Sequence, residues 1–347
     1  MLVGGCLVGA LLTWLVFRNT DWSGVAKAFT RANPLFLILA ALGIALAFFI
    51  RSLRWRYAVQ VSGRAPLRQL FSATQIGSFA HAALPVRAGP LVQAGMLARL
   101  LNRPFSRCLA AAIVDRMTES LGLALIVVTG LLTLPVEGEF SVAPDVFGTK
   151  EAIHVSGNLL RIAGFALVGV LTIHILLLFG LHWQRRRLVR LFEYAAGFFS
   201  THWAERLSAS LNRFAESLHI FQRKSDVVKM GALNALYWTM ILGSCASVFA
   251  AFGLPLSWYA PFVVLTLVTF SLVIPGAPGF VGQYHLGVVL ALVAVAPQVS
   301  ATDAKAFAIA LHFIHVGTIV LLGLGCLILE HVSLGELQEV EEEAEAL

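Results

Sequence analysis

The chain has 347 residues, of which 58% are hydrophobic and only 13% are charged. Soluble domains carry about 25% charged residues, so this composition excludes an ordinary soluble domain and indicates an all-α polytopic membrane protein. The formal net charge of +6 does not predict a nucleic-acid partner, because the basic residues gather in a few loops between apolar segments. The four cysteines show no metal or redox spacing, so no metal or cofactor is expected.

Membrane crossings can be predicted from apolar length, because a helix needs about 20 apolar residues to span the hydrocarbon core. About six uninterrupted crossings are predicted, and they are, in chain order, 1–17, 34–50, 107–134, 156–181, 230–253 and 305–329. Two further apolar regions, 67–102 and 257–297, are interrupted by prolines and glycines at 84–90 and 274–285, where an ordinary helix cannot continue.

Loop charges predict which side of the membrane each loop faces. Residues 51–68 carry five arginines and residues 87–107 carry four, both without an acid, and residues 183–229 are also basic. These loops are expected in the cytoplasm. Residues 135–154 carry four acids against one lysine, and they are expected to form an external loop.

Both interrupted regions are predicted to be re-entrant helical hairpins. The first two basic loops flank residues 67–86 yet belong on one side, so this segment should enter the bilayer and return. The same rule makes 257–297 re-entrant from the opposite face. The chain then becomes an inverted repeat of 1–134 and 155–330, with hairpins that meet near the midplane and both termini in the cytoplasm. Eight plain crossings with two kinks are the alternative.

Two further segments are expected outside the crossings. Apolar residues recur every three or four positions through 183–228 with charges between them, which is typical of an amphipathic interfacial helix. We interpret it as a structural linker within the second repeat, with sensing of anionic lipid as the alternative. The tail 331–347 is rich in glutamate and is predicted to be solvated, mostly disordered and cytoplasmic.

Three ionisable residues, Asp115, Arg116 and Glu119, lie inside one predicted crossing. A charge at the bilayer centre costs about 2.5–3.5 kcal/mol on insertion scales, so these groups should face a cavity or one another. Asp115 and Glu119 share one helix face, and Arg116 points elsewhere. They indicate a site for a lipid headgroup or for a proton; an internal ion-pair network is the alternative.

Three arginines are candidates for holding a lipid phosphate. Arg87 lies just past Pro85 in the first break, and a guanidinium is a planar fork of donors that suits phosphate. Snorkelling to the interface is the alternative for this residue. Arg51 and Arg54 end an early crossing, where ordinary interface anchoring competes with gathering anionic headgroups.

The broken regions add glycines and histidines to the candidate set. Gly279 and Gly282 would let the backbone approach a ligand. His312 and His315 share a helix face but have no carboxylate or cysteine at metal-ligand spacing, so packing or proton relay is expected. The residues predicted to contact the substrate are Arg51, Arg54, His81, Arg87, Asp115, Arg116, Glu119, Gly279, Gly282, Gln283 and His285.

Several short motifs occur in a recognisable order: RSLRW at 51–55, IG at 76–77, LPVRAG at 84–89, DRMTE at 115–119 and APGFVG at 277–282. Together they resemble the lysylphosphatidylglycerol synthase transmembrane, or flippase-like, family. The resemblance covers nearly the whole chain and implies movement of lipid headgroups across a bilayer. Fused members also carry a soluble aminoacyltransferase domain, and this chain is expected to be a stand-alone member that retains only the translocating half.

The chain departs from the family pattern at three positions. His81 replaces a frequent asparagine, Pro90 a usual glutamate and His285 a common acid. The loss of two membrane carboxylates argues against a cationic aminoacyl headgroup. The remaining residues favour a phosphate-bearing or neutral lipid.

The sequence therefore predicts a bacterial inner-membrane lipid flippase or transporter that performs translocation and no covalent chemistry. There is no P-loop, nucleophile elbow, zinc-protease pair or Rossmann fingerprint, so no ATPase of its own is expected. Movement would be downhill or proton-coupled through Asp115, Glu119 or His285. Two alternatives stay open: an intramembrane lipid-modifying enzyme, and an accessory subunit that partners a lipid-synthesis enzyme.

Overall fold

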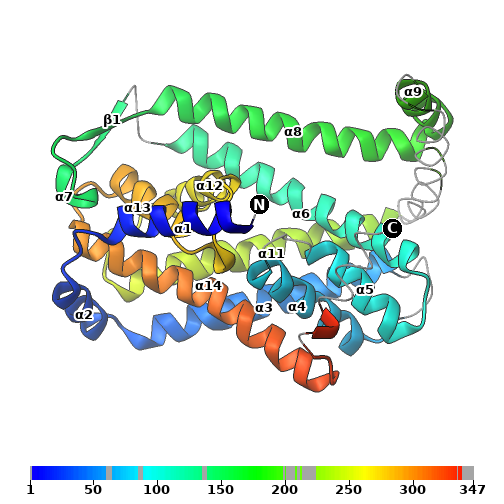
Figure 1. The fold of residues 1–347 in the computed structure, drawn as a ribbon, viewed down its shortest axis with the longest axis horizontal. Coiled ribbons are helices and arrows are strands. Elements are labelled where there is room, and N and C mark those ends of the chain that lie inside the picture. Colours follow the sequence, from blue (N-terminus) through cyan, green and yellow to red (C-terminus); the bar gives the residue numbers. More distant parts are fainter. Residues whose placement is uncertain are drawn as a thin grey trace.

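The computed structural model of the chain describes residues 2–59, 65–84, 89–134, 139–197, 200, 208, 212, 224–333 and 335–337. The protein is an all-α polytopic membrane protein with one short antiparallel strand pair (Figure 1). Its elements are α1 (Leu2–Phe17), α2 (Trp22–Arg31), α3 (Pro34–Val59), α4 (Leu67–Ala83), α5 (Gly89–Leu101), α6 (Phe105–Thr133), β1 (Glu139–Val142), α7 (Pro144–Phe147), β2 (Ile153–Ser156), α8 (Gly157–Trp183), α9 (Arg185–Gly197), α11 (Lys224–Ala251), α12 (Ala260–Val273), the 3₁₀ turn η3 (Pro278–Phe280), α13 (Gln283–Val295) and α14 (Ala301–Leu329).

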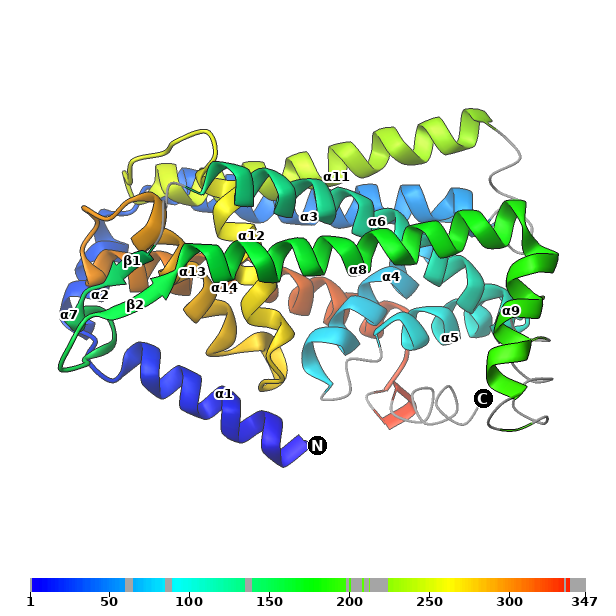
Figure 2. The same cartoon turned by 90° about the horizontal axis from the view of Figure 1, so that it is seen from above.

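Four stretches in the described ranges are long and apolar enough to cross a membrane: α3, α11, α14 and the η3–α13 segment Pro278–Val295. At a rise of about 1.5 Å per residue, the 29 residues of α6 and the 27 of α8 are also long enough. The predicted first crossing is a helix of only 16 residues. Its first residue lies near the middle of the molecule's length in Figures 1 and 2. The exact number of crossings stays a prediction.

Short polar residues explain where several of these helices begin. The carboxylate of Asp21 accepts from the backbone N–H of Ser23 and caps α2, and the hydroxyl of Ser300 accepts from the N–H of Asp303 and caps α14. Such caps satisfy backbone donors that have no partner within the helix. Pro34 is the first residue of α3, a position where its missing N–H costs nothing.

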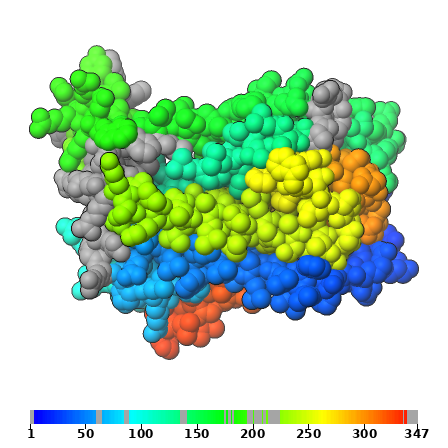
Figure 3. All heavy atoms as spheres, turned by 180° about the vertical axis from the view of Figure 1, so that it is seen from behind, coloured from blue at the N-terminus to red at the C-terminus, as the bar shows by residue number. Residues whose placement is uncertain are grey.

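The two halves pack in an equivalent way. Helices α3 and α11 lie side by side over much of their length and run in opposite directions (Figures 1 and 3). Around this pair, α4 packs on α5 and α14, while α12 packs on α13 and α6. In this comparison α4 corresponds to α12, α5 to α13 and α6 to α14. Each helix of the first half then has the same neighbours as its counterpart in the second half. This arrangement is the one expected of an inverted repeat.

Each broken region forms a helical hairpin. The helices α4 and α5 have 17 and 13 residues, and α12 and α13 have 14 and 13, all shorter than the roughly 20 residues of a crossing. The hairpins meet, because η3 packs on α4 and the rings of His81 and Phe280 lie 5.9 Å apart. Residues 85–88 of the first break lie outside the described residues. Re-entry from opposite membrane faces stays a prediction.

The absence of a side chain at Gly287 lets α12 and α13 approach closely. A Cβ there would lie 2.5 Å from the Ser271 hydroxyl and 2.7 Å from the Val268 Cα. We expect Gly287→Ala to lower the free energy of unfolding by about 1–3 kcal/mol through overpacking. The control is Gly243→Ala in α11, where nothing lies within 4 Å of the added carbon, so the change should be neutral or stabilising by up to about 1 kcal/mol. Unfolding in detergent measures both, and equal losses would contradict this packing.

The first part of the acidic tail is docked, and the disorder predicted for most of the tail stays a prediction. Leu337 is buried against the cluster formed by α4, α5 and α6, since an apolar side chain gains by leaving water. Glu330 accepts from Ser72 on α4, and Glu336 pairs with Arg99 on α5 at 2.8 Å. The end of α14 and the start of the tail therefore contact both arms of the first hairpin. Residues 338–347 lie outside the described residues.

The contact between Arg99 and Glu336 makes the stability of the folded protein depend on pH. The hydrogen bond from Arg99 lowers the pKa of Glu336 to about 2. A depressed carboxyl pKa contributes stability above the unfolded value near 4.5, and this contribution is lost as the pH falls towards 2. In Arg99→Gln the pKa should return towards about 4.3, whereas Arg107→Gln should leave it unchanged. A ¹³C NMR titration of labelled glutamates, with Glu336→Gln to assign the signal, measures this.

Candidate functional site

A buried charge cluster joins α3 to α6. Arg51 and Arg54 lie about one turn apart on α3, and both reach Asp115 on α6. Arg54 Nη2 lies 2.8 Å from Asp115 Oδ1, and Arg51 Nε lies 3.4 Å from Oδ2. All three residues are buried, with at most 2% of their surface exposed. The two arginines are thus internal, and the interface anchoring considered from the sequence does not apply to them.

Glu119 and Arg116 complete this cluster one turn along α6. Glu119 Oε2 lies 3.5 Å from Arg51, 3.7 Å from Arg54 and 3.4 Å from Arg116. Three arginines therefore face two carboxylates, which leaves one net positive charge among the five side chains. Burying an ion is costly unless it is paired, so an excess cation inside a membrane protein calls for a functional explanation.

The cluster extends to α11 and to the first hairpin, through residues that the sequence analysis missed. On α11, Asn234 accepts from Arg54, and the Tyr237 hydroxyl donates to Glu119 at 3.3 Å. On α4 and α5, Ser78 and Gln93 accept from Arg51 at 3.3 and 3.4 Å. Asn234 and Tyr237 could have been found, because polar groups three positions apart share a face of an otherwise apolar helix.

Arg116 is the most exposed arginine of the cluster and has fewer hydrogen bonds in the described residues than Arg51 or Arg54. Its side chain is 28% exposed, against 2% or less for the side chains of Arg51 and Arg54. One nitrogen pairs with Glu119, while its Nε is buried without a hydrogen-bond partner in the described ranges. A guanidinium has five N–H donors, so Arg116 has donors with which it can bind an anion.

The second break has its own polar group, built by α13 and α14. His312 Nε2 donates to the Gly279 carbonyl at 2.7 Å, and the rings of His285 and His312 lie 4.5 Å apart. The Tyr284 hydroxyl and His315 Nδ1 are 2.8 Å apart. These contacts fix the broken backbone to α14. Among the residues that the structure describes, no group of three His, Cys, Asp or Glu side chains could hold a metal ion.

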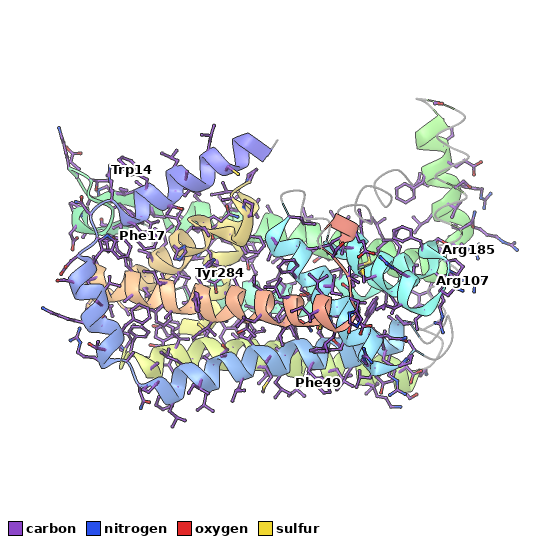
Figure 4. All side chains as sticks on the ribbon, turned by 60° about the horizontal axis from the view of Figure 1, so that its bottom comes forward. Trp14, Phe17, Phe49, Arg107, Arg185 and Tyr284 are labelled. Carbon is purple, nitrogen blue, oxygen red and sulfur yellow. The ribbon has the colours of Figure 1, made fainter. Side chains whose placement is uncertain are left out.

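His285 caps a helix. Its Nδ1 accepts from the Gly282 N–H at 3.3 Å, and its ring packs edge-on against Phe17 of α1. The residue is only 5% exposed. Figure 4 shows Phe17 and Tyr284 in the same part of the molecule. The structure places His285 inside the packed hairpin, and the predicted contact between His285 and the substrate stays a prediction.

The glycines of the second break serve its turn and its packing. Gly279 and Gly282 have φ angles of +72° and +89°, which side chains rarely adopt. A Cβ on Gly282 would lie 2.6 Å from the Gly9 carbonyl of α1, so α1 packs closely against this glycine. The approach of a ligand at Gly279 and Gly282 stays a prediction. Gln283 is fully buried, and its amide has no hydrogen-bond partner within the described segments.

The predicted site residues thus fall into two groups. Arg51, Arg54, Asp115, Arg116 and Glu119 form the charge cluster. Gly279, Gly282, Gln283 and His285 belong to the second break, and His81 touches this break through Phe280. Arg87, the predicted phosphate ligand, lies outside the described residues.

Two comparisons with known proteins bear on this site. A family model described as the lysylphosphatidylglycerol synthase TM region matches residues 2–323. The chain is also 25% identical, over 359 aligned positions, to a protein of Haloferax volcanii named glycosyltransferase AglD. The alignment covers 99% of this chain and 56% of that relative, so the chain spans little more than half the length of the relative.

The second comparison corrects one prediction from the sequence. We predicted translocation without covalent chemistry, from the absence of catalytic motifs. That prediction is contradicted by a relative that carries the name of an enzyme and aligns with almost the whole chain. Motif searches detect only known arrangements of catalytic residues, so missing motifs could not exclude an enzymatic role.

Proposed function

Because the chain belongs to the lysylphosphatidylglycerol synthase transmembrane-region family, we propose that it binds a phosphate-bearing lipid or lipid-linked headgroup and moves it across a bacterial inner membrane. The observation that carries this proposal is the buried charge cluster with one net positive charge. Phosphate is the anion for which arginine is best suited, because the planar fork of donors matches two oxygens at once.

The position of the cluster supports movement as well as binding. Its members come from α3 and α6 of the first half, from α11 of the second, and from the hairpin α4/α5. A phosphate bound at Arg116 would compete with Glu119 for the same guanidinium. Loosening that pair changes the contacts between the halves through Tyr237. Switching a shared ion pair in this way couples ligand binding to a rearrangement of packed helices.

The proposed topology places the basic end in the cytoplasm, with both termini on that side. Arg107 and Arg185 lie at one end of the molecule, and Trp14 lies towards the other (Figure 4). The strands β1 and β2 lie at the end opposite α9 (Figure 2). The positive-inside rule then makes 135–154 external. Energy would come from a downhill lipid gradient or from protons, with Glu119 as the carboxylate nearest to Arg116.

Reconstitution tests this proposal. Purified protein in liposomes that contain fluorescent phosphatidylglycerol should speed the exchange of that lipid between leaflets, measured by dithionite quenching of the outer leaflet. Liposomes without protein give the background rate. Exchange at the background rate would contradict the proposal. If the rate of lipid exchange is unchanged by a pH gradient and also by the Glu119→Gln substitution, proton coupling is excluded.

Lipid modification is a second candidate, because the relative described above is named a glycosyltransferase. In that case the cluster would hold the phosphate of a lipid-linked acceptor or donor during sugar transfer. Mass spectrometry of lipids incubated with the protein and an activated sugar separates the two candidates. A gain of one sugar on the lipid supports transfer, and unchanged lipid masses with faster leaflet exchange support translocation. Co-purification with a lipid-synthesis enzyme, without either activity, would favour an accessory role.

A further inference from the structure

A second basic site lies where α8 ends and α9 begins. Gln184 leaves the helical conformation with φ −127° and ψ 38°, and the chain turns there. In Figure 1, α9 is seen end-on while α8 lies across the picture, and Figure 2 shows α9 running across the direction of α8. The helix is anchored by Val189, which is buried. If α8 crosses the membrane, α9 therefore lies along its surface.

The corner between these helices holds a hollow of about 650 Å³ with four arginines in its wall. The lining residues are Trp183, Gln184, Arg185, Arg186, Arg187 and Arg190. Among the residues that the structure describes, the lining contains no acidic side chain, and Arg186, Arg187 and Arg190 place three positive charges beside Arg185 around one space. A cluster of basic side chains beside a membrane surface attracts anionic lipid headgroups.

Local hydrogen bonds orient three of these four arginines. Arg185 Nε donates to Asn212 Oδ1 at 2.8 Å, Arg187 donates to Gln184 Oε1 at 3.3 Å, and Arg190 Nε donates to the Arg186 carbonyl at 3.1 Å. Each of these bonds uses one of the five donors of a guanidinium. Holding part of each group in place lowers the entropy lost when a ligand binds.

Large apolar side chains accompany the arginines. Trp183, Leu191 and Tyr194 are 75%, 60% and 70% exposed. Exposed aromatic residues beside basic ones are typical of a helix at the boundary between headgroups and acyl chains. A ligand in this hollow would therefore be expected to have acyl chains as well as negative charge.

We propose that the hollow binds the phosphate of an anionic phospholipid from the same leaflet, at a peripheral site separate from the charge cluster of α3 and α6. The arginines contact the phosphate oxygens, and Trp183 lies beside the glycerol backbone and the first acyl carbons. The inference does not depend on translocation. A protein that moves, modifies or only organises lipids would use such a site equally well.

Quenching of Trp183 by brominated lipid tests this site locally. Full-length protein is placed in phosphatidylcholine nanodiscs with a small fraction of brominated phosphatidylglycerol or brominated phosphatidylcholine. The signal of Trp183 is the difference between the wild type and Trp183→Phe. Brominated phosphatidylglycerol should quench Trp183 more strongly than brominated phosphatidylcholine. The triple variant Arg186→Gln, Arg187→Gln, Arg190→Gln should lose this preference, by about fivefold in association constant per arginine and on the order of 100-fold in total.

Two matched changes and one soluble competitor complete the experiment. Lysines at the same three positions should keep most of the preference, since they keep the charge. Lys27→Gln on α2, outside the lining of the hollow, should keep all of it. An unchanged preference in the triple glutamine variant would overturn the proposal. Loss of the preference on adding inorganic phosphate, but not chloride of equal ionic strength, would also overturn it, because the site would then take a soluble phosphate.

Discussion

The Asp115→Asn substitution is expected to lower the free energy of unfolding by about 3–5 kcal/mol, the usual cost of removing one partner from a buried ion pair. Asp115 is fully buried and accepts from both Arg51 and Arg54. Asparagine keeps the size and one carbonyl oxygen but removes the charge. Glu119 would then be the single carboxylate facing three arginines of the cluster. Reversible unfolding of the purified protein in mixed micelles measures the loss.

A surface pair provides the control for this prediction. Asp303 lies 3.6 Å from Arg31, and the two side chains are 34% and 73% exposed. Exposed pairs contribute up to about 1 kcal/mol, so Asp303→Asn should have a small effect. The double variant Arg51→Gln, Asp115→Asn returns the cluster to the wild-type excess of one positive charge and should recover part of the loss. Equal losses for Asp115→Asn and Asp303→Asn would show that the cluster is not a buried ion network.

The Arg116→Gln substitution is expected to reduce lipid exchange between leaflets by about 10- to 150-fold, while the protein remains folded. The reduction corresponds to the roughly 1.5–3 kcal/mol of a hydrogen bond to a charged group. Folding should be preserved, because Arg116 is partly exposed and its removal leaves two arginines facing two carboxylates. Exchange of fluorescent phosphatidylglycerol in liposomes and the unfolding midpoint are measured on the same preparation.

Two variants separate a role in phosphate binding from a general effect of charge. Arg116→Lys should retain part of the activity, since lysine keeps the charge but loses the planar fork. Arg31→Gln removes one exposed charge from α2 and should leave exchange unchanged. A wild-type exchange rate for Arg116→Gln would mean that the excess charge of the cluster does not contact the substrate.

The membrane class, the two broken hairpins and the ionisable residues of α6 could be predicted from the sequence, because each depends on local composition. Proline and glycine interrupt a helix wherever they occur, and a charge in an apolar run needs a partner. The identity of that partner depends on tertiary packing. Arg51 and Arg54 appeared to end a crossing, but α3 continues to Val59 and carries both into contact with Asp115.

At the second break, the structure shows packing contacts at positions where the sequence predicts contacts with a ligand. Its glycines were expected to admit a ligand, yet Gly282 admits α1. Positive φ angles and close packing both require glycine, and a sequence does not say what approaches it. His285 was expected to contact the substrate, and it caps α13. A histidine three residues after a glycine can satisfy a backbone donor as readily as it can bind a ligand.

The most direct test of the charge cluster compares two lipids that differ in phosphate. Liposomes carrying fluorescent phosphatidylglycerol are matched with liposomes carrying a fluorescent neutral glycolipid of the same acyl chains, and leaflet exchange is measured for the wild type and Arg116→Gln. We expect the wild type to exchange phosphatidylglycerol faster, and Arg116→Gln to remove that difference. Equal rates for the two lipids in the wild type, unchanged in Arg116→Gln, would contradict a phosphate-binding role for the cluster.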